Sequence, residues 1–149
     1  MIEWQWCVLD DLSARRLYAV LAAREEVFVV EQNCVYRDLD GLDLNAMHLV
    51  GWAGNDVAAY TRVLGPGASF AEPSIGRVLT AKAFRGSGLG QELFARSMAY
   101  AQALYPGQNI RIGAQSHLER FYASFGFAKA SQEYVEDGIP HIEMLWVAQ

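Results

Sequence analysis

Two spacings of apolar residues follow one another along the chain, and each spacing indicates a different kind of element. Short runs rich in β-branched and aromatic residues predict strands, whereas apolar positions three and four residues apart predict helices. This pattern predicts strands over 4–9, 47–52, 57–64, 75–81 and 110–114, helices over 13–30, 88–105 and 117–125, and last strands from 127 onward and over 142–147.

Turn and capping residues fall between these elements. Ser13 can cap the first long helix, Gly54-Asn55 separates two apolar runs as in a hairpin, and Pro106-Gly107 ends the second long helix. A further turn is predicted at Asp137-Gly138-Ile139-Pro140. No repeat or linker interrupts the order β-α-ββ-β-α-β-α-ββ. We therefore predict one α/β domain over 1–149, with a mixed sheet flanked by helices.

The composition is that of a domain with a large core. The chain has 149 residues, of which 52% are apolar and 12% aromatic, and a single domain is expected at this length. The net charge of −5 and the lack of a basic stripe argue against a nucleic-acid partner. No apolar run could span a bilayer, and the first residues lack a signal-peptide pattern, so we expect a cytoplasmic protein without a membrane partner.

Acidic residues are concentrated in two segments, over 25–43 and after Ala130. They are either solvated faces or a negative rim that attracts a cationic substrate such as an amine. The two cysteines, Cys7 and Cys34, lack metal-ligand spacing. They are expected to be packed thiols rather than nucleophiles, and no metal site is predicted.

The most informative motif is a basic, glycine-rich turn between a predicted strand and a predicted helix. It consists of Arg85, Gly86, Ser87, Gly88, Leu89 and Gly90. Its glycines allow close approach of a ligand, and the free amides at the helix start favour an anion. The spacing fits neither the P-loop nor the dinucleotide fingerprint. The turn therefore indicates another phosphate-bearing ligand, or it is a tight turn only.

The pattern R-x-x-G-x-G resembles the pyrophosphate-binding turn of the GCN5-related N-acetyltransferases (the GNAT superfamily). A second motif, Y-x-x-x-G-F from Tyr122 to Phe127, follows in the order found in that family. Three further segments, 24–34, 113–127 and 136–142, resemble the ElaA-like subgroup, and the resemblance covers nearly the whole chain. It implies a mostly antiparallel sheet of six to seven strands, splayed at its centre and flanked by about four helices.

The resemblance also implies a reaction and its coenzyme site. The expected activity is direct transfer of acetyl from acetyl-CoA to a primary amine in a ternary complex. The glycine turn would hold the pyrophosphate, and the backbone of the strand Val78-Leu79-Thr80 would pair with the pantetheine. Tyr122 would lie beside the coenzyme sulfur as the general acid. Alternatively, Tyr122 is a packed core residue with a satisfied hydroxyl group.

The base that activates the amine is not identified by the sequence. Its candidates are Glu31, Asp40, Asp43, His48, His117 and His141. Among them, His117 is expected at a helix start, where the dipole keeps an imidazole neutral. Glu31 either forms a structural pair with Arg24, two helical turns away, or both residues line the acceptor pocket together with His141.

Arg77 stands within a predicted central strand and needs a partner, which could be Glu31, Glu72 or a carboxylate of the substrate. The acceptor, a small-molecule or peptide amine, is not identified. Two other functions fit the same motifs: an acyl-homoserine-lactone-synthase-like acyltransferase and a non-catalytic acyl-CoA sensor. Exposed strand edges would allow a homodimer.

Overall fold

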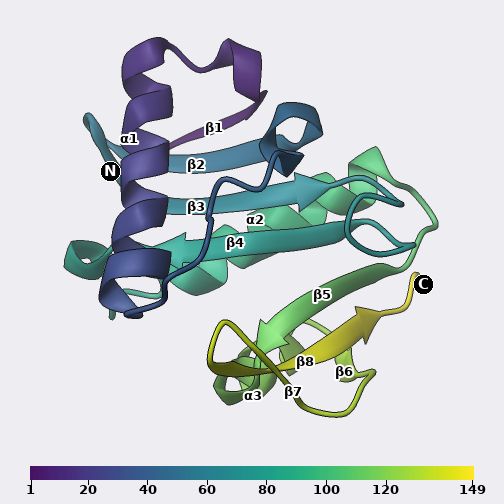
Figure 1. The fold of residues 1–149 in the computed structure, drawn as a ribbon. Coiled ribbons are helices and arrows are strands. Elements are labelled where there is room, and N and C mark those ends of the chain that lie inside the picture. Colours follow the sequence, from purple (N-terminus) through teal and green to yellow (C-terminus); the bar gives the residue numbers. More distant parts are fainter.

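The computed structural model describes residues 1–149 as two antiparallel four-stranded sheets with helices packed against them (Figure 1). The first sheet has the order β1 (Glu3–Val8), β2 (Met47–Ala53), β3 (Asp56–Leu64) and β4 (Ser74–Thr80). In the second, β8 (Ile139–Trp146) pairs with β5 (Ile110–Gln115), β6 (Ala128–Lys129) and β7 (Tyr134–Glu136). The α-helices are α1 (Ala14–Glu25), α2 (Leu89–Leu104) and α3 (Glu119–Ala123).

The two long helices lie on opposite faces of the first sheet (Figure 1). Alternate residues of a strand face opposite sides, and neighbouring positions on β2 and β3 divide accordingly. Val50 and Tyr60 pack with residues of α1, whereas Leu49 and Ala59 pack with residues of α2. The Ser13 hydroxyl caps α1 by accepting a hydrogen bond from the Arg16 backbone N–H, as the sequence predicts.

The strands β4 and β5 diverge (Figure 1). They lie close at one end, where the Arg111 N–H donates to the Pro73 carbonyl oxygen at 3.1 Å. Beyond this point no strand pairing joins the two sheets. The expected splay at the centre of the fold is therefore confirmed, and it leaves one edge of β4 without a neighbouring strand.

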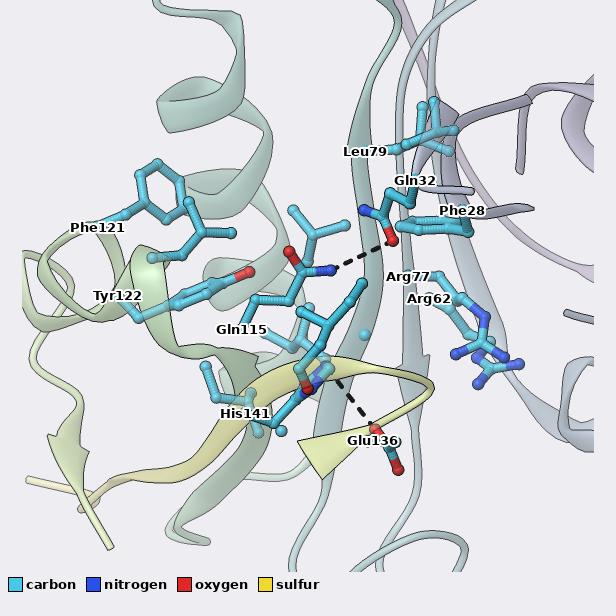
Figure 2. Close-up of a pocket in the computed structure, with 18 of the residues that line it drawn as sticks. Phe28, Gln32, Arg62, Arg77, Leu79, Gln115, Phe121, Tyr122, Glu136 and His141 are labelled. Carbon is cyan, nitrogen blue, oxygen red and sulfur yellow. Dashed lines mark hydrogen bonds and ion pairs between the residues drawn. The ribbon is translucent and has the colours of Figure 1, made fainter. Parts of the chain in front are cut away.

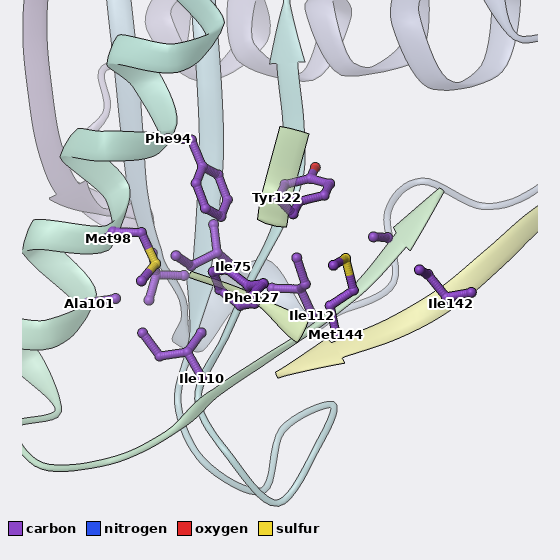
Figure 3. Close-up of a cluster of buried hydrophobic side chains, with 12 residues drawn as sticks. Ile75, Phe94, Met98, Ala101, Ile110, Ile112, Tyr122, Phe127, Ile142 and Met144 are labelled. Atoms are coloured by element: carbon purple, nitrogen blue, oxygen red, sulfur yellow. The ribbon is translucent and has the colours of Figure 1, made fainter. Parts of the chain in front are cut away.

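A cluster of aromatic rings joins α3 to α2 (Figure 3). The ring of Phe94 on α2 makes edge-on contacts with Phe121, Tyr122, Phe125 and Phe127, at centroid distances of 4.9 to 6.0 Å. Such contacts add to the area that the rings bury. The cluster thereby fixes the short helix that carries Tyr122.

The fold class that the sequence predicts is confirmed, although the number of elements differs. There are eight strands in two sheets rather than one sheet of six to seven, and three α-helices rather than about four. The first helix is α-helical only to Glu25 and continues as a wider π-helical turn over Glu26–Glu31. This segment is rich in β-branched valines, which are poor α-helix formers, and the turn buries both Val27 and Phe28.

Leucines on α2 provide a test of this packing. Leu93 is fully buried between α2 and the first sheet, whereas Leu104 at the end of the same helix is 45% exposed. We expect Leu93→Ala to lower the free energy of unfolding by about 2–5 kcal/mol, because it leaves a cavity. Leu104→Ala is the control and should change it by less than about 0.5 kcal/mol. Urea denaturation measures both, and equal losses would contradict the packing described.

Candidate active site

A cavity of about 1270 Å³ occupies the space between the diverging strands (Figure 2). Its walls come from the π-helical turn, β4, the glycine turn, β5, α3 and the β7–β8 hairpin. Sites for one small ligand usually measure about 300–1,000 Å³. The cavity is therefore large enough for two substrates side by side.

The glycine turn presents a row of unpaired donors at one end of this cavity. The backbone N–H groups from Gly86 to Gln91 have no acceptor within the chain. Gly86 and Gly88 have φ angles of 87° and 82°, which a side chain rarely tolerates. The amides also stand at the N-terminus of the 16-residue helix α2, where its dipole favours an anion. The turn is therefore built to hold a phosphate or a similar group.

Arg85, the basic residue of this turn, has a carboxylate partner within the chain. Its Nη1 forms an ion pair with Glu31 Oε1 at 2.7 Å, and its Nε donates to the Thr80 carbonyl oxygen at 2.9 Å. The predicted pair between Arg24 and Glu31 is thus wrong. The Arg85–Glu31 pair instead ties the glycine turn to the π-helical turn across the cavity mouth.

The open edge of β4 begins at a distortion of the strand. The register with β3 shifts between Tyr60 and Arg62, and Arg77 opposite this shift has a φ of 50°, a left-handed conformation costly for an arginine. Further along, the Ala81 N–H bonds to β3 at the Ala58 carbonyl. Because alternate residues of a strand bond to the same side, the backbone groups of Val78 and Thr80 point away from β3, toward the cavity.

Tyr122 is 6% exposed, but its hydroxyl group has no hydrogen-bond partner in the chain. Figure 2 shows the phenol oxygen pointing into the space beside Gln115 of β5. Burial raises the pKa of this phenol to about 12. The group therefore keeps its proton at neutral pH and can act as a hydrogen-bond donor to an atom in the cavity.

Comparison of the whole chain with known proteins agrees with this arrangement of splayed strands, free amides and a phenol. The profile of the acetyltransferase (GNAT) domain matches residues 10–148. The chain belongs to the GNAT family. It is 44% identical to the protein ElaA of Escherichia coli over 146 residues, which cover 97% of this chain and 95% of that protein.

Solved structures extend the likeness to three dimensions. An acyl-CoA N-acyltransferase from Pseudomonas aeruginosa has a TM-score of 0.93 at 40% identity and covers 99% of this chain and 100% of its own. The Escherichia coli ElaA structure has a TM-score of 0.92 at 42% identity, covering 98% and 99%. A CoA-dependent acyl-homoserine lactone synthase reaches a TM-score of 0.79 at 13% identity, covering 100% and 83%, which shows a shared fold alone.

A network of arginines and aspartates, most of them buried, adjoins the cavity of this GNAT domain, and three of its members, Asp40, Arg62 and Arg77, line the cavity wall. Arg24 is fully buried and donates from Nε to Asp38 Oδ2 at 2.9 Å and from Nη1 to Asp43 Oδ1 at 2.7 Å. Arg62 pairs with Asp40 and Asp43 at 2.8 and 3.1 Å. Arg24 does not line the cavity, so the expectation that it contacts a substrate is not met.

The same network accounts for Arg77. Its guanidinium group pairs with Asp38 at 2.7 Å and with Asp40 at 3.3 Å, rather than with Glu31 or Glu72. Glu72 instead pairs with Arg111. The acidic segment over 25–43 is thus not simply a solvated face, because Asp38 and Asp43 are buried in it. Each arginine of this network therefore has a carboxylate partner within the chain.

Several candidate bases are excluded by their partners. Burial alone would raise the pKa of Asp40, but hydrogen bonds from Arg62 and from the Leu42 N–H lower it to about 2. Asp43 is held by Arg24 and Arg62, and its pKa is lowered despite its burial. Both ring nitrogens of the buried His48 are engaged, one by the Tyr60 hydroxyl and one by the Asp43 carbonyl. These groups are poor proton acceptors for an amine.

The remaining predicted residues lie around the cavity. His117 and His141 line it, as do Arg77, Val78, Leu79, Thr80 and the turn residues Arg85, Gly86, Gly88, Leu89 and Gly90. Ser87 faces away, and its hydroxyl donates to the Phe84 carbonyl. Cys34 also lines the cavity, with its thiol donating to the Asp137 carbonyl at 2.9 Å, while Cys7 is buried elsewhere.

Sequence reasoning did not single out several wall residues, among them Gln32, Gln115 and Glu136. The Gln115 side chain donates to the Gln32 side chain across the cavity at 3.4 Å (Figure 2). No group of three or more metal-ligating side chains is present, and no helix has the length and apolar character needed to cross a membrane.

The buried network leads to a test of stability. Arg24→Leu removes one of the two arginine partners from each of the buried carboxylates of Asp38 and Asp43, and the Arg77 and Arg62 that remain are shared with Asp40. We therefore expect the free energy of unfolding at pH 7 to fall by about 3–5 kcal/mol. Arg37→Leu, at an exposed arginine without an ion pair, is the control and should change it little.

The effect of Arg24→Leu should depend on pH. The pKa of Asp43 is lower in the folded protein than its ordinary value, so its ionised form stabilises the fold above about pH 4 and this contribution is lost as the pH falls further. The difference between wild type and variant, measured by urea denaturation, should therefore narrow below about pH 4. A difference that is constant with pH would contradict the ion pairs described.

Proposed function

We propose that the protein transfers an acetyl group from acetyl-CoA to a primary amine by direct attack. The observation that carries the proposal is the row of free amides from Gly86 to Gln91, which opens into the same cavity as the unpaired hydroxyl of Tyr122. The amides would bind the pyrophosphate of the coenzyme. The open edge of β4 would pair with the pantetheine and bring the thioester toward Tyr122.

On this proposal, the nitrogen of the amine attacks the thioester carbonyl carbon, the carbon–sulfur bond breaks and the thiolate of coenzyme A leaves. A backbone N–H near Val78 at the open edge of β4 would stabilise charge that develops on the carbonyl oxygen. The rate gain would come mainly from holding the two substrates in line.

Tyr122 would act on the departing sulfur. A thiol has a pKa of about 8.5, well below the value of about 12 for this phenol. The phenol would therefore stabilise the thiolate by donating a hydrogen bond, while the proton lost overall comes from the attacking amine. The expected role of Tyr122 as an acid thus becomes that of a hydrogen-bond donor.

The charges around the cavity favour an acceptor without a carboxylate close to its amine. Arg62, Arg77 and Arg85 each have carboxylate partners already. Glu136 and Asp137 line the cavity and form no ion pair with a lysine or arginine. A cationic amine therefore fits this end of the cavity better than an amino acid.

The coenzyme site is tested by ligand-induced stabilisation. A ligand at 100 times its Kd raises the free energy of unfolding by about 2.7 kcal/mol. We expect acetyl-CoA to produce a clear rise in Tm, and ATP and NAD to produce none. Gly88→Leu should abolish the rise, because a side chain there would occupy the space of the phosphates.

The control for Gly88→Leu is Gly54→Leu in the β2–β3 hairpin. Both glycines have a positive φ and open space around the missing Cβ, so the backbone strain is alike, but Gly54 lies outside the cavity. Gly54→Leu should keep the response to acetyl-CoA. If wild type shows no response at millimolar ligand, or if both variants lose it equally, the coenzyme assignment is wrong.

Catalysis is tested at Tyr122. Tyr122→Phe should lower kcat for acetylation of an alkylamine by about 100-fold, a typical loss when one hydrogen-bond donor to a developing negative charge is removed. The Kd for acetyl-CoA, measured by calorimetry, should stay within about twofold of wild type. Stability should not fall, because the hydroxyl has no partner in the chain to lose.

Other outcomes would favour the other functions. Unchanged kcat in Tyr122→Phe would remove the tyrosine from the mechanism. Coenzyme binding without any turnover would indicate an acyl-CoA sensor. Faster turnover with longer acyl donors than with acetyl-CoA would favour the acyl-homoserine-lactone-synthase-like activity.

A further inference from the structure

His141 differs from the other two histidines in how its ring is held. His48 is buried away from the cavity, and both of its nitrogens are engaged. His117 is exposed at the cavity edge and makes no hydrogen bond. His141 lines the cavity with a side chain that is only 12% exposed. Histidine is also the side chain whose neutral form is ordinarily available as a base near pH 7.

The hydrogen bonds of His141 fix which nitrogen is basic. Nδ1 lies 2.7 Å from the Ile139 carbonyl oxygen, which can only accept a hydrogen bond. We therefore assign the proton of the neutral ring to Nδ1, which leaves the lone pair on Nε2. Nε2 is 3.8 Å from Glu136 Oε2 (Figure 2), a distance at which an ion pair forms when Nε2 takes up a proton.

The β7–β8 hairpin positions His141 and Glu136. In its register Tyr134 lies opposite His141 and Glu136 opposite Ile139, and the Tyr134 ring stacks on the imidazole at 5.9 Å between centroids. On the other side of β8, Gln115 of β5 lies opposite His141. The thiol of Cys34 donates to the Asp137 carbonyl, which ties the hairpin to the segment that follows the π-helical turn.

The charged and titratable groups around the ring are few. They are Tyr134 and Glu136 of β7, Asp137 of the turn, Cys34, and Glu143 of β8, which is held by Arg111 of β5 at 3.0 Å. Near Nε2 the nearest charged partner is the carboxylate of Glu136. The carboxylate of Glu136 therefore lies within ion-pair distance of the nitrogen that would receive the proton.

We propose that His141 is the base that takes the proton from the attacking amine, and that Glu136 is a positioning residue for the resulting imidazolium. This inference rests on the proposed acetyl transfer. The ammonium form of the acceptor gives one proton to Nε2 of His141, which frees the nitrogen lone pair for attack. As the carbon–nitrogen bond then forms and the carbon–sulfur bond breaks, the second proton leaves the nitrogen for water and the thiolate of coenzyme A departs. The ring, now paired with Glu136, later releases the proton to solvent.

The test uses acceptors that differ in their need for a base. An alkylamine is mainly protonated at pH 7 and must lose a proton, whereas 2,2,2-trifluoroethylamine is mainly neutral. We expect His141→Gln to lower kcat/KM about 100-fold with the alkylamine and less than about fivefold with the fluorinated amine. Calorimetry with acetyl-CoA should give the wild-type Kd, which shows that the variant is folded.

Two outcomes would overturn the assignment. Equal losses with both amines would mean that His141 has a structural role only. A loss that depends on the amine in His117→Gln, but not in His141→Gln, would identify the other histidine as the base. If wild type binds acetyl-CoA but acetylates neither amine, the proposed function itself fails. The first two outcomes overturn only the role of His141 and leave the proposed function in place.

Glu136 is tested by the pH dependence of kcat/KM with the alkylamine, which needs the base and stays protonated over the pH range measured. In wild type, kcat/KM should fall at low pH as the base becomes protonated. Glu136→Gln removes the charge that favours this protonation, so the fall should move to lower pH. Glu133→Gln, which removes an equal charge outside the cavity, should leave the profile unchanged. A profile that stays in place in Glu136→Gln overturns the role of Glu136.

Discussion

The divergence of β4 from β5 is the constraint on which the rest of this structure depends. Backbone N–H and C=O groups need partners, and a sheet normally supplies them along its whole length. Here β4 has a neighbour on one side only, and the amides of the glycine turn have no acceptor in the chain. The fold therefore leaves main-chain groups that can form hydrogen bonds with water or a ligand. The proposed coenzyme site thus consists mainly of backbone atoms rather than side chains.

Ion pairs between side chains stabilise the irregular backbone that accompanies this divergence. Arg77 holds a left-handed conformation in β4, and its guanidinium group is fixed by Asp38 and Asp40. Those aspartates belong to the loop between the π-helical turn and β2, which Arg24 anchors from the helix. One network of ion pairs thus stabilises both the distorted strand and the loop that lines part of the cavity. Arg24 therefore supports the wall of the cavity, although it does not line the cavity itself.

The features of the fold and the site that could be predicted from the sequence are those determined by residues adjacent in the chain. The hairpin at Gly54-Asn55, the cap at Ser13 and the glycine turn are local, and each lies where the sequence places it. The partners in ion pairs could not be predicted in this way, because a charged side chain can pair with residues that are distant in the sequence. Arg24 bonds to Asp38 and Asp43 rather than to Glu31, and Arg85 takes Glu31. Glu31 stands at the end of the π-helical turn and lines the cavity, as Arg85 does, whereas Arg24 does not.

The same contrast separates the two ends of the cavity. The proposed coenzyme end consists of backbone atoms, and its geometry follows from the fold that this chain shares with other GNAT proteins. The opposite end consists of side chains from the β7–β8 hairpin and the loop after the π-helical turn, with Cys34 joining the two. Membership of the family therefore predicts the acyl donor better than the acceptor. The charges of the side chains support the proposed cationic acceptor instead. Arg62, Arg77 and Arg85 are paired with carboxylates, whereas Glu136 and Asp137 form no ion pair with a lysine or arginine.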